Sequence, residues 1–117
     1  MAKKKTPRDS MAMLEVLRRT VSESVRRESP DLTARQLAVM MTVYLTPEPH
    51  TVRGLAAALN ISKPVVTRAL DRLSALDFIR RKKDASDGRN VLVVPTVNGS
   101  VYLRELGDIA TAASRGK

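Results

Sequence analysis

The fold is decided by residues 51–76, TVRGLAAALNISKPVVTRALDRLSAL, in which two helical patterns flank a short turn. Thr51 is suited to cap the first helix, because its side-chain oxygen can accept a hydrogen bond from a backbone N–H group of the first turn. The apolar positions of this short helix share one face: Leu55, Ala58 and Leu59. Asn60 tolerates the left-handed conformation in which helices often end, so residues 59–61 are predicted to form the turn.

The second helix is predicted to begin after Ser62, a good N-cap residue, with Lys63 and Pro64 in its first turn, where proline sacrifices no hydrogen bond. Apolar residues then recur at steps of three and four, which predicts one buried stripe: Val66, Ala69, Leu70, Leu73 and Leu76. The other side chains make a short, polar and basic face: Lys63, Val65, Thr67, Arg68, Asp71 and Arg72. Together the two helices indicate a helix-turn-helix.

Two runs of strand length follow, residues 78–83 and 90–94, and six residues rich in Asp, Ser and Gly separate them. This pattern predicts a β-hairpin with a longer loop. Asp side chains can bond neighbouring backbone N–H groups and Gly accepts positive φ, so three residues are expected to build the loop: Asp84, Asp87 and Gly88. The predicted fold is therefore mainly α with a small β-hairpin, a winged helix-turn-helix over residues 51–95.

Four segments carry a resemblance to a known family. Leu32-Thr33 opens a helix, Ser62–Arg68 has the pattern of a recognition helix, Asp84–Arg89 that of a wing, and Val94–Gly99 leads into a final helix. Over residues 32–106 the chain resembles the MarR family of bacterial transcription regulators, and the most specific element is the wing followed by a valine-rich strand and Thr-x-x-Gly. The resemblance implies sequence-specific binding of double-stranded DNA, with the second helix in the major groove and the wing at the minor groove.

The chain departs from the family pattern at two places. The wing usually carries a second arginine two residues after its first aspartate, and this chain has Ser86 at that position instead. Small polar residues are usual where this chain has Pro64 and Val65. Apolar contact with thymine methyl groups can replace hydrogen bonding at those two positions.

The candidate DNA-contacting residues lie on the helix-turn-helix and on the wing. Arg89 at the edge of the loop is expected to enter a minor groove, whose negative potential favours arginine. The alternative is a surface arginine paired with Asp84 or Asp87. The full set of candidates is Thr51, Ser62, Lys63, Pro64, Val65, Thr67, Arg68, Arg72, Lys82, Lys83, Ser86 and Arg89.

The net charge of +9 is distributed unevenly along the chain. Residues 63–89 hold eight basic and four acidic side chains, and residues 1–30 hold the same numbers, so each segment has a net charge of +4. A basic run taken alone is more often a solvated surface. In residues 63–89 the charge coincides with the predicted recognition helix and wing, which favours contacts with DNA phosphates.

Helices are also predicted at the two ends, residues 9–28 and 97–113, and the resemblance implies that they form a dimerisation platform. The first is capped by Asp9 or Ser10, ends at Ser29-Pro30-Asp31, and has an apolar stripe that needs to be buried. A homodimer would bury this stripe and match a palindromic site, and a monomer or an unusual dimer is the alternative. The expected dimer contacts are Met11, Leu14, Leu17, Val21, Val101 and Leu106.

Between these ends, Thr33 and Gln36 are predicted to form a capping box for a helix that ends at Leu45. The interior of that helix is expected to be core rather than a ligand site: Leu37, Met40, Met41 and Tyr44. Because the platform is short in this chain, no small-molecule effector is assigned.

At 117 residues the chain fits one compact domain, predicted for residues 9–113, with a disordered basic tail at 1–8 and a flexible tail at 114–117. Alternatively, residues 1–8 form a basic arm that contacts DNA phosphates. The chain has no cysteine, which excludes a disulfide or a thiolate metal site. No membrane span or signal peptide is visible, so the expected location is the cytoplasm, with nucleoid association. No cofactor or metal is expected.

No constellation for catalysis is visible, and an enzyme is not expected. The single histidine, His50, has no partner at the spacing of a triad or a metal site, and its expected role is solvated or capping. Two other functions compete with regulation. One is a nucleoid-type architectural protein that coats DNA with little sequence preference, and the other is a winged-helix module that binds another regulator or a polymerase.

Overall fold

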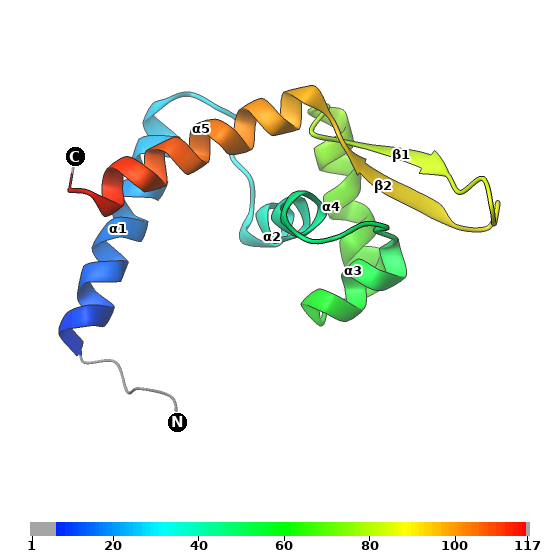
Figure 1. Cartoon of the computed structure of the whole chain (residues 1–117), viewed down its shortest axis with the longest axis horizontal. Helices are drawn as coiled ribbons and strands as arrows, with labels where there is room; N and C mark the ends of the chain where they lie inside the picture. Colours follow the sequence, from blue (N-terminus) through cyan, green and yellow to red (C-terminus); the bar gives the residue numbers. More distant parts are fainter. Residues whose placement is uncertain (1–6, 117) are drawn as a thin grey trace. The chain divides into compact units, whose positions relative to one another are not determined.

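The computed structural model describes residues 7–116, which form five helices and one two-stranded sheet (Figure 1). The elements in chain order are α1 (Pro7–Arg26), α2 (Ala34–Leu45), α3 (Val52–Leu59), α4 (Lys63–Ala75), β1 (Ile79–Lys83), β2 (Val91–Pro95) and α5 (Val97–Ser114). They belong to two compact units. Residues 32–103 form the helix-turn-helix unit, and the described parts of residues 1–31 and 104–117 form the terminal unit.

Local capping signals place α3 and α4 where the sequence predicts them. The Thr51 hydroxyl oxygen accepts a hydrogen bond from the Gly54 N–H at 3.0 Å, and the Ser62 hydroxyl oxygen accepts one from the Val65 N–H at 3.3 Å. Asn60 ends α3 with a φ of 53°, in the left-handed region. Each N-cap stabilises its helix by about 1 kcal/mol. The predicted turn between the two helices is confirmed.

The capping box at the start of α2 is also present. The Gln36 N–H donates to the Thr33 hydroxyl oxygen at 3.1 Å, and the Thr33 N–H donates to the Gln36 side-chain oxygen at 2.9 Å. The helix ends at Leu45, as predicted.

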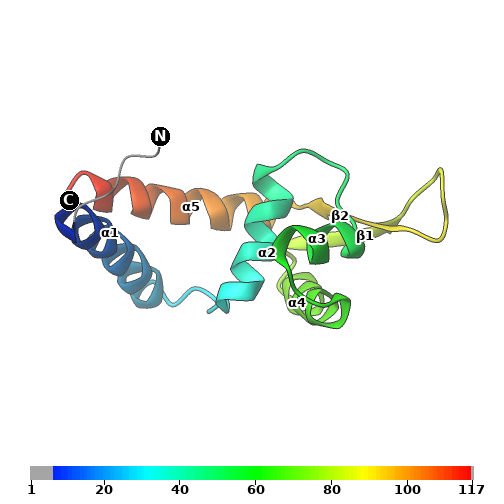
Figure 2. The same ribbon diagram turned by 90° about the horizontal axis from the view of Figure 1, so that it is seen from below.

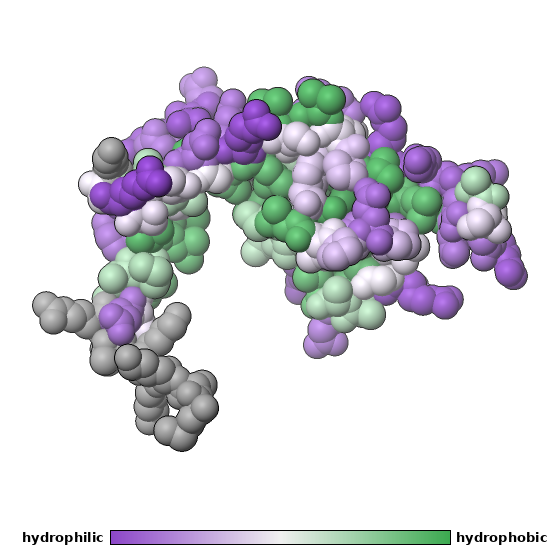
Figure 3. Space-filling model, in the orientation of Figure 1, coloured by the Kyte–Doolittle hydropathy of each residue, from purple (hydrophilic) through white to green (hydrophobic). Residues whose placement is uncertain are grey.

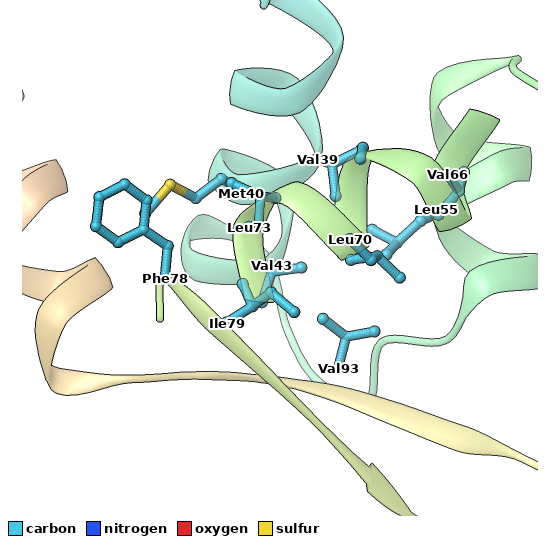
Figure 4. Packing of buried hydrophobic residues seen from close by; sticks show 11 residues of the cluster. Val39, Met40, Val43, Leu55, Val66, Leu70, Leu73, Phe78, Ile79 and Val93 are labelled. Atoms are coloured by element: carbon cyan, nitrogen blue, oxygen red, sulfur yellow. The ribbon is translucent and has the colours of Figure 1, made fainter. Parts of the chain in front are cut away.

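The core of the helix-turn-helix unit is built from α2, α3, α4 and the hairpin, whose apolar side chains point toward one another (Figure 4). The predicted stripe of α4 is confirmed: Val66, Ala69, Leu70 and Leu73 are buried, and Leu76 is half-buried. The face of α3 is rotated from the predicted one, because Ala58 is exposed and Val52 and Ala56 pack against the core. Val52, Ala56 and Leu59 lie next to one another on the helix surface, and this side of α3, together with Leu55, faces the core.

The hairpin pairs β1 with β2 in antiparallel register, from Ile79 opposite Pro95 to Lys83 opposite Val91. Each strand begins one residue later than predicted, because the buried Phe78 and the loop residue Asn90 lie outside the ladder. Figures 1 and 2 show the loop of the hairpin projecting away from α3 and α4. The predicted mainly α fold with a winged helix-turn-helix is thus present.

Tyr44 joins α2 to both strands at the base of the hairpin. Its hydroxyl donates to the Phe78 carbonyl oxygen at 2.6 Å and accepts from the Thr96 N–H at 2.9 Å. The Thr96 side chain accepts from the Gly99 N–H at 3.0 Å, which caps α5, and donates to the Asp77 carbonyl oxygen at 2.7 Å. Gly99 is buried against the Tyr44 hydroxyl. This packing is the physical reason for the Thr-x-x-Gly pattern of residues 96–99.

His50 is buried, with 8% of its surface exposed, so a solvated role is wrong. Its Nε2 lies 3.0 Å from the carbonyl oxygen of Thr46, the residue that caps the C-terminus of α2. Its own carbonyl oxygen accepts a hydrogen bond from the Val93 N–H at 2.9 Å. These contacts agree with the capping role and also fasten the loop before α3 to β2.

In the terminal unit, α1 begins at Pro7 and ends at Arg26, two residues before each predicted boundary, and Glu28 follows with a positive φ of 56°. Of the predicted tail, residues 1–6 lie outside the described residues, whereas residues 7 and 8 begin α1. At the other end α5 includes Ser114, one residue more than predicted. Among residues 9–31 and 104–116 the buried side chains are Thr20, Ile109 and Ala113.

The apolar stripe of α1 is exposed in the single chain. Five of its side chains expose between 52% and 60% of their surface: Met11, Leu14, Leu17, Val21 and Val25. Of the other two predicted dimer contacts, Val101 is exposed and Leu106 is half-buried. Figure 3 shows hydrophobic side chains at the surface of α1. No helix among the described residues is both long and apolar enough to cross a membrane.

Candidate nucleic-acid interface

The exposed face of α4 lies opposite its buried stripe. Five candidate contacts on this face are exposed: Lys63, Pro64, Thr67, Arg68 and Arg72. Asp71 is also exposed on this face, and Val65 is half-buried at its edge. The stripe anchors α4 to the core, so these side chains are held on a helix that cannot rotate without exposing Val66 and Leu70. A rigid helix with an exposed polar and basic face is the form of element that fits a major groove.

Thr51 and Ser62, two further candidates, each use a hydroxyl oxygen as a helix cap. A hydroxyl that accepts one hydrogen bond keeps its own proton for donation. Both residues therefore remain able to donate to a phosphate oxygen from the start of α3 or α4, where the helix dipole also favours negative charge.

The register of the hairpin separates basic residues that are adjacent in sequence. Side chains alternate between the two faces of a strand, so Arg81 and Lys83 share the face of the buried Ile79, and Lys82 lies on the opposite face with Arg80. Lys82 and Lys83, both candidate DNA contacts, thus point to opposite sides of the hairpin. Figure 3 shows hydrophilic side chains gathered toward the loop end of the hairpin and hydrophobic ones nearer to the helices.

One ion pair links the hairpin to α4. The Arg81 guanidinium lies 2.9 Å from Asp71 Oδ1, with the Arg81 side chain 33% exposed and the Asp71 side chain 60% exposed. Neither residue is among the predicted DNA contacts. The sequence signal is the alternation of β1, which places Arg81 on the face of Ile79, but finding its partner requires the packing of β1 against α4.

The loop of the hairpin is built by carboxylates. Asp84 Oδ1 accepts from the Ser86 hydroxyl at 2.7 Å and from the Ser86 N–H at 2.9 Å. The side-chain hydrogen bond, followed by the backbone one, lowers the pKa of Asp84, so this carboxylate stays ionised. The Ser86 hydroxyl, a predicted DNA contact, is turned toward Asp84 instead.

Arg89 follows a second turn of the same kind. Asp87 Oδ1 accepts from the Arg89 N–H at 3.1 Å, which holds the backbone. The Arg89 side chain is 93% exposed, and its Nε lies 3.4 Å from the same Asp87 oxygen. The structure therefore contains the Asp87 pair that the alternative role requires. An ion pair this exposed contributes at most about 1 kcal/mol, so it does not hold the guanidinium against a stronger partner.

The role predicted for Gly88 is wrong in one respect. Its φ does not lie in the positive region, and a Cβ added to it would meet no atom within 4 Å. The two aspartates satisfy the turning backbone, so the loop does not need the conformational freedom of glycine.

No cluster of three or more His, Asp or Glu side chains suited to a metal ion occurs among residues 7–116. The candidate interface therefore consists of a rigid basic helix, two capped helix starts and a hairpin with an exposed arginine near its tip.

Comparison with known proteins gives a family and a fold. The model of the MarR family matches residues 31–90. A variant of S. aureus MepR bound to an oligodeoxyribonucleotide shares 21% identity over 97% of this chain and 82% of its own, with a TM-score of 0.79. A variant of E. coli MarR complexed with operator DNA shares 20% identity over 92% and 71%, with a TM-score of 0.68.

A variant of Lactococcus lactis ZitR shares 25% identity over 75% of this chain and 59% of its own, with a TM-score of 0.66. Comparison with curated protein sequences gives no match. The likeness to MepR and MarR, each below 25% identity, establishes the winged fold of the chain.

Proposed function

Because the chain belongs to the MarR family of transcription regulators, we propose that it binds a specific double-stranded DNA sequence as a homodimer, with α4 in the major groove and the hairpin at the minor groove. The observation that carries this proposal is the exposed face of α4, which is polar and basic and is held by the stripe opposite it. The DNA-bound states of the MepR and MarR variants support the same assignment.

The proposal assigns base contacts and phosphate contacts to different residues. Arg68 and Thr67 reach base edges and Pro64 meets thymine methyl groups, which reads sequence. Thr51, Ser62, Lys63, Arg72 and the lysines of β1 contact phosphates, which supplies affinity that falls with salt. Arg89, which is nearly fully exposed, enters the adjacent minor groove.

The experiment that tests this function begins with selection of duplexes from a random-sequence library by the purified protein. We expect the tightest selected duplex to bind at least about a thousandfold more tightly than an unselected duplex at the same salt concentration. Equal affinity for the two duplexes would contradict regulation and indicate an architectural protein that coats DNA. Failure to bind either duplex would favour the protein-binding module.

The homodimer is proposed from the apolar stripe of α1. Five large apolar side chains, each more than half exposed, lie on α1, and exposed apolar patches mark interaction sites. A second copy of the chain is the partner that a two-fold symmetric DNA site requires. Two subunits present two recognition helices about one helical turn of DNA apart.

Leu17→Glu should produce a folded monomer, because it places an unpaired carboxylate in the middle of the stripe. Sedimentation equilibrium measures the mass, and circular dichroism measures the folding of the same sample. Leu45→Glu is the matched control, since Leu45 is also an exposed leucine (76%) but lies at the end of α2. If the Leu17→Glu protein remains a dimer, α1 is not part of the interface. If it unfolds, Leu17 belongs to the core of the folded chain.

A further inference from the structure

We infer that Arg81 is a positioning residue for DNA recognition: it masks the carboxylate of Asp71, so that the recognition helix presents no free negative charge to DNA. This inference rests on the proposed DNA-binding function. Asp71 is the one acidic residue of α4, whose sequence is KPVVTRALDRLSA.

Asp71 lies on the face of α4 that is proposed to meet DNA. It follows Thr67 by four residues and Arg68 by three, spacings that bring side chains onto the same side of a helix. Its side chain is 60% exposed. An unpaired carboxylate at this position would repel phosphates and would compete for the Arg68 guanidinium that is proposed to read a base.

Arg81 is held in a geometry that neutralises this carboxylate. It shares the helix-facing side of β1 with the buried Ile79, and its side chain is two-thirds covered although its guanidinium reaches Asp71 Oδ1 at 2.9 Å. A partly covered guanidinium loses less entropy on pairing than a fully exposed one, and its planar fork suits a carboxylate. The same contact joins the first strand of the wing to the recognition helix.

The neighbouring arginine has no such role. Arg80 lies on the opposite face of β1, its side chain is 72% exposed, and its guanidinium is 3.8 Å from Asp77, outside α4. Arg80 and Arg81 therefore carry the same charge on the same strand, but only Arg81 covers a carboxylate of the recognition helix. This makes Arg80 a control for the loss of one positive charge from β1.

The test is a double-mutant cycle on the tightest duplex selected from the random library. Arg81→Ala should weaken binding by about tenfold or more, because it exposes the Asp71 carboxylate to DNA. Asp71→Asn alone should change the affinity by less than about threefold, and Arg81→Ala combined with Asp71→Asn should recover most of the loss. Arg80→Ala should cost about threefold or less, whether or not Asp71→Asn is present.

Two further measurements separate masking from a merely structural role. The urea midpoint of each variant, followed by circular dichroism, should change little in comparison with the change in affinity, and Arg81→Lys should retain most of the binding because it keeps the charge. If Arg81→Ala loses cooperative unfolding, Arg81→Gln replaces it, since glutamine keeps part of the stem.

The inference is overturned if Arg81→Ala weakens binding by the same factor with and without Asp71→Asn, since Arg81 would then contact DNA directly. It is also overturned if Arg81→Ala leaves the affinity unchanged. A wild-type protein that prefers no duplex would overturn the proposed function itself, and this inference with it. Sequence-selective binding without coupling between residues 71 and 81 would overturn the inference alone.

Discussion

Gly99→Ala should destabilise the helix-turn-helix unit by about 2–5 kcal/mol, although alanine is the better helix former. A Cβ at this position would overlap the Tyr44 hydroxyl and the Phe78 carbonyl oxygen, and would lie 2.8 Å from Tyr44 Cζ. The Phe78 oxygen belongs to the backbone and cannot swing away. Relief therefore requires Tyr44 to leave, which breaks its hydrogen bonds to Phe78 and Thr96, and also requires the start of α5 to shift away from the Phe78 carbonyl oxygen.

Urea unfolding followed by circular dichroism, at one protein concentration, measures this effect. Gly107→Ala is the matched control, because Gly107 is in the same helix and a Cβ there meets nothing within 4 Å of the single chain. It should stabilise the chain by about 0.5–1 kcal/mol. Tyr44→Phe should be less costly when Gly99→Ala is already present, because the hydroxyl that clashes is gone. A Gly99→Ala protein as stable as wild type would show that α5 can shift away from the hairpin.

Arg68→Ala should weaken binding to the selected duplex by about 1–3 kcal/mol, because a bidentate contact with one guanine would be lost in each half-site. Arg68 is exposed and takes part in none of the ion pairs found among residues 7–116, so its donors are available to a base edge. The loss should fall on one base pair of each half-site. Duplexes already mutated at that pair should bind wild type and variant alike.

The measurement is a titration of both proteins against the selected duplex and its single-base-pair variants at fixed salt. Arg72→Ala is the control, because it removes the same charge one turn farther along α4 and should weaken binding to all duplexes about equally. An equal loss on every duplex for Arg68→Ala would make it a phosphate contact. If Arg68→Ala causes no loss of affinity at all, α4 is not the recognition helix.

The elements best predicted from sequence are those determined within a few residues. The caps Thr33, Thr51 and Ser62 bond to N–H groups three positions ahead, and Asn60 ends α3 through its own backbone angles. The stripe of α4 is likewise a property of one helix. These local signals were sufficient to predict the turn, both helices that flank it and the hairpin.

The features that escaped prediction depend on contacts between distant residues. Tyr44 and Gly99 are far apart in sequence, and their contact requires α2, the hairpin and α5 to be packed together. The Asp71–Arg81 pair depends on which face of β1 turns toward α4. His50 was expected in solvent or at a cap because no partner residue was visible in the sequence, and its burial depends on the packing of its loop against β2. Neither composition nor periodicity reports such pairings.

The loop of the hairpin tolerates change better than its glycine suggests. Because Asp84 and Asp87 make the turn and Gly88 has no positive φ, an ordinary L residue fits position 88 without strain and would project into open space. The backbone of the loop and the side chains it displays can therefore vary independently. Under selection, single substitutions in this loop can therefore change the proposed minor-groove contacts and leave folding untouched, whereas substitutions in α4 must also preserve the core beneath it. Among regulators with this fold, DNA-contacting residues should therefore change first in the loop of the hairpin.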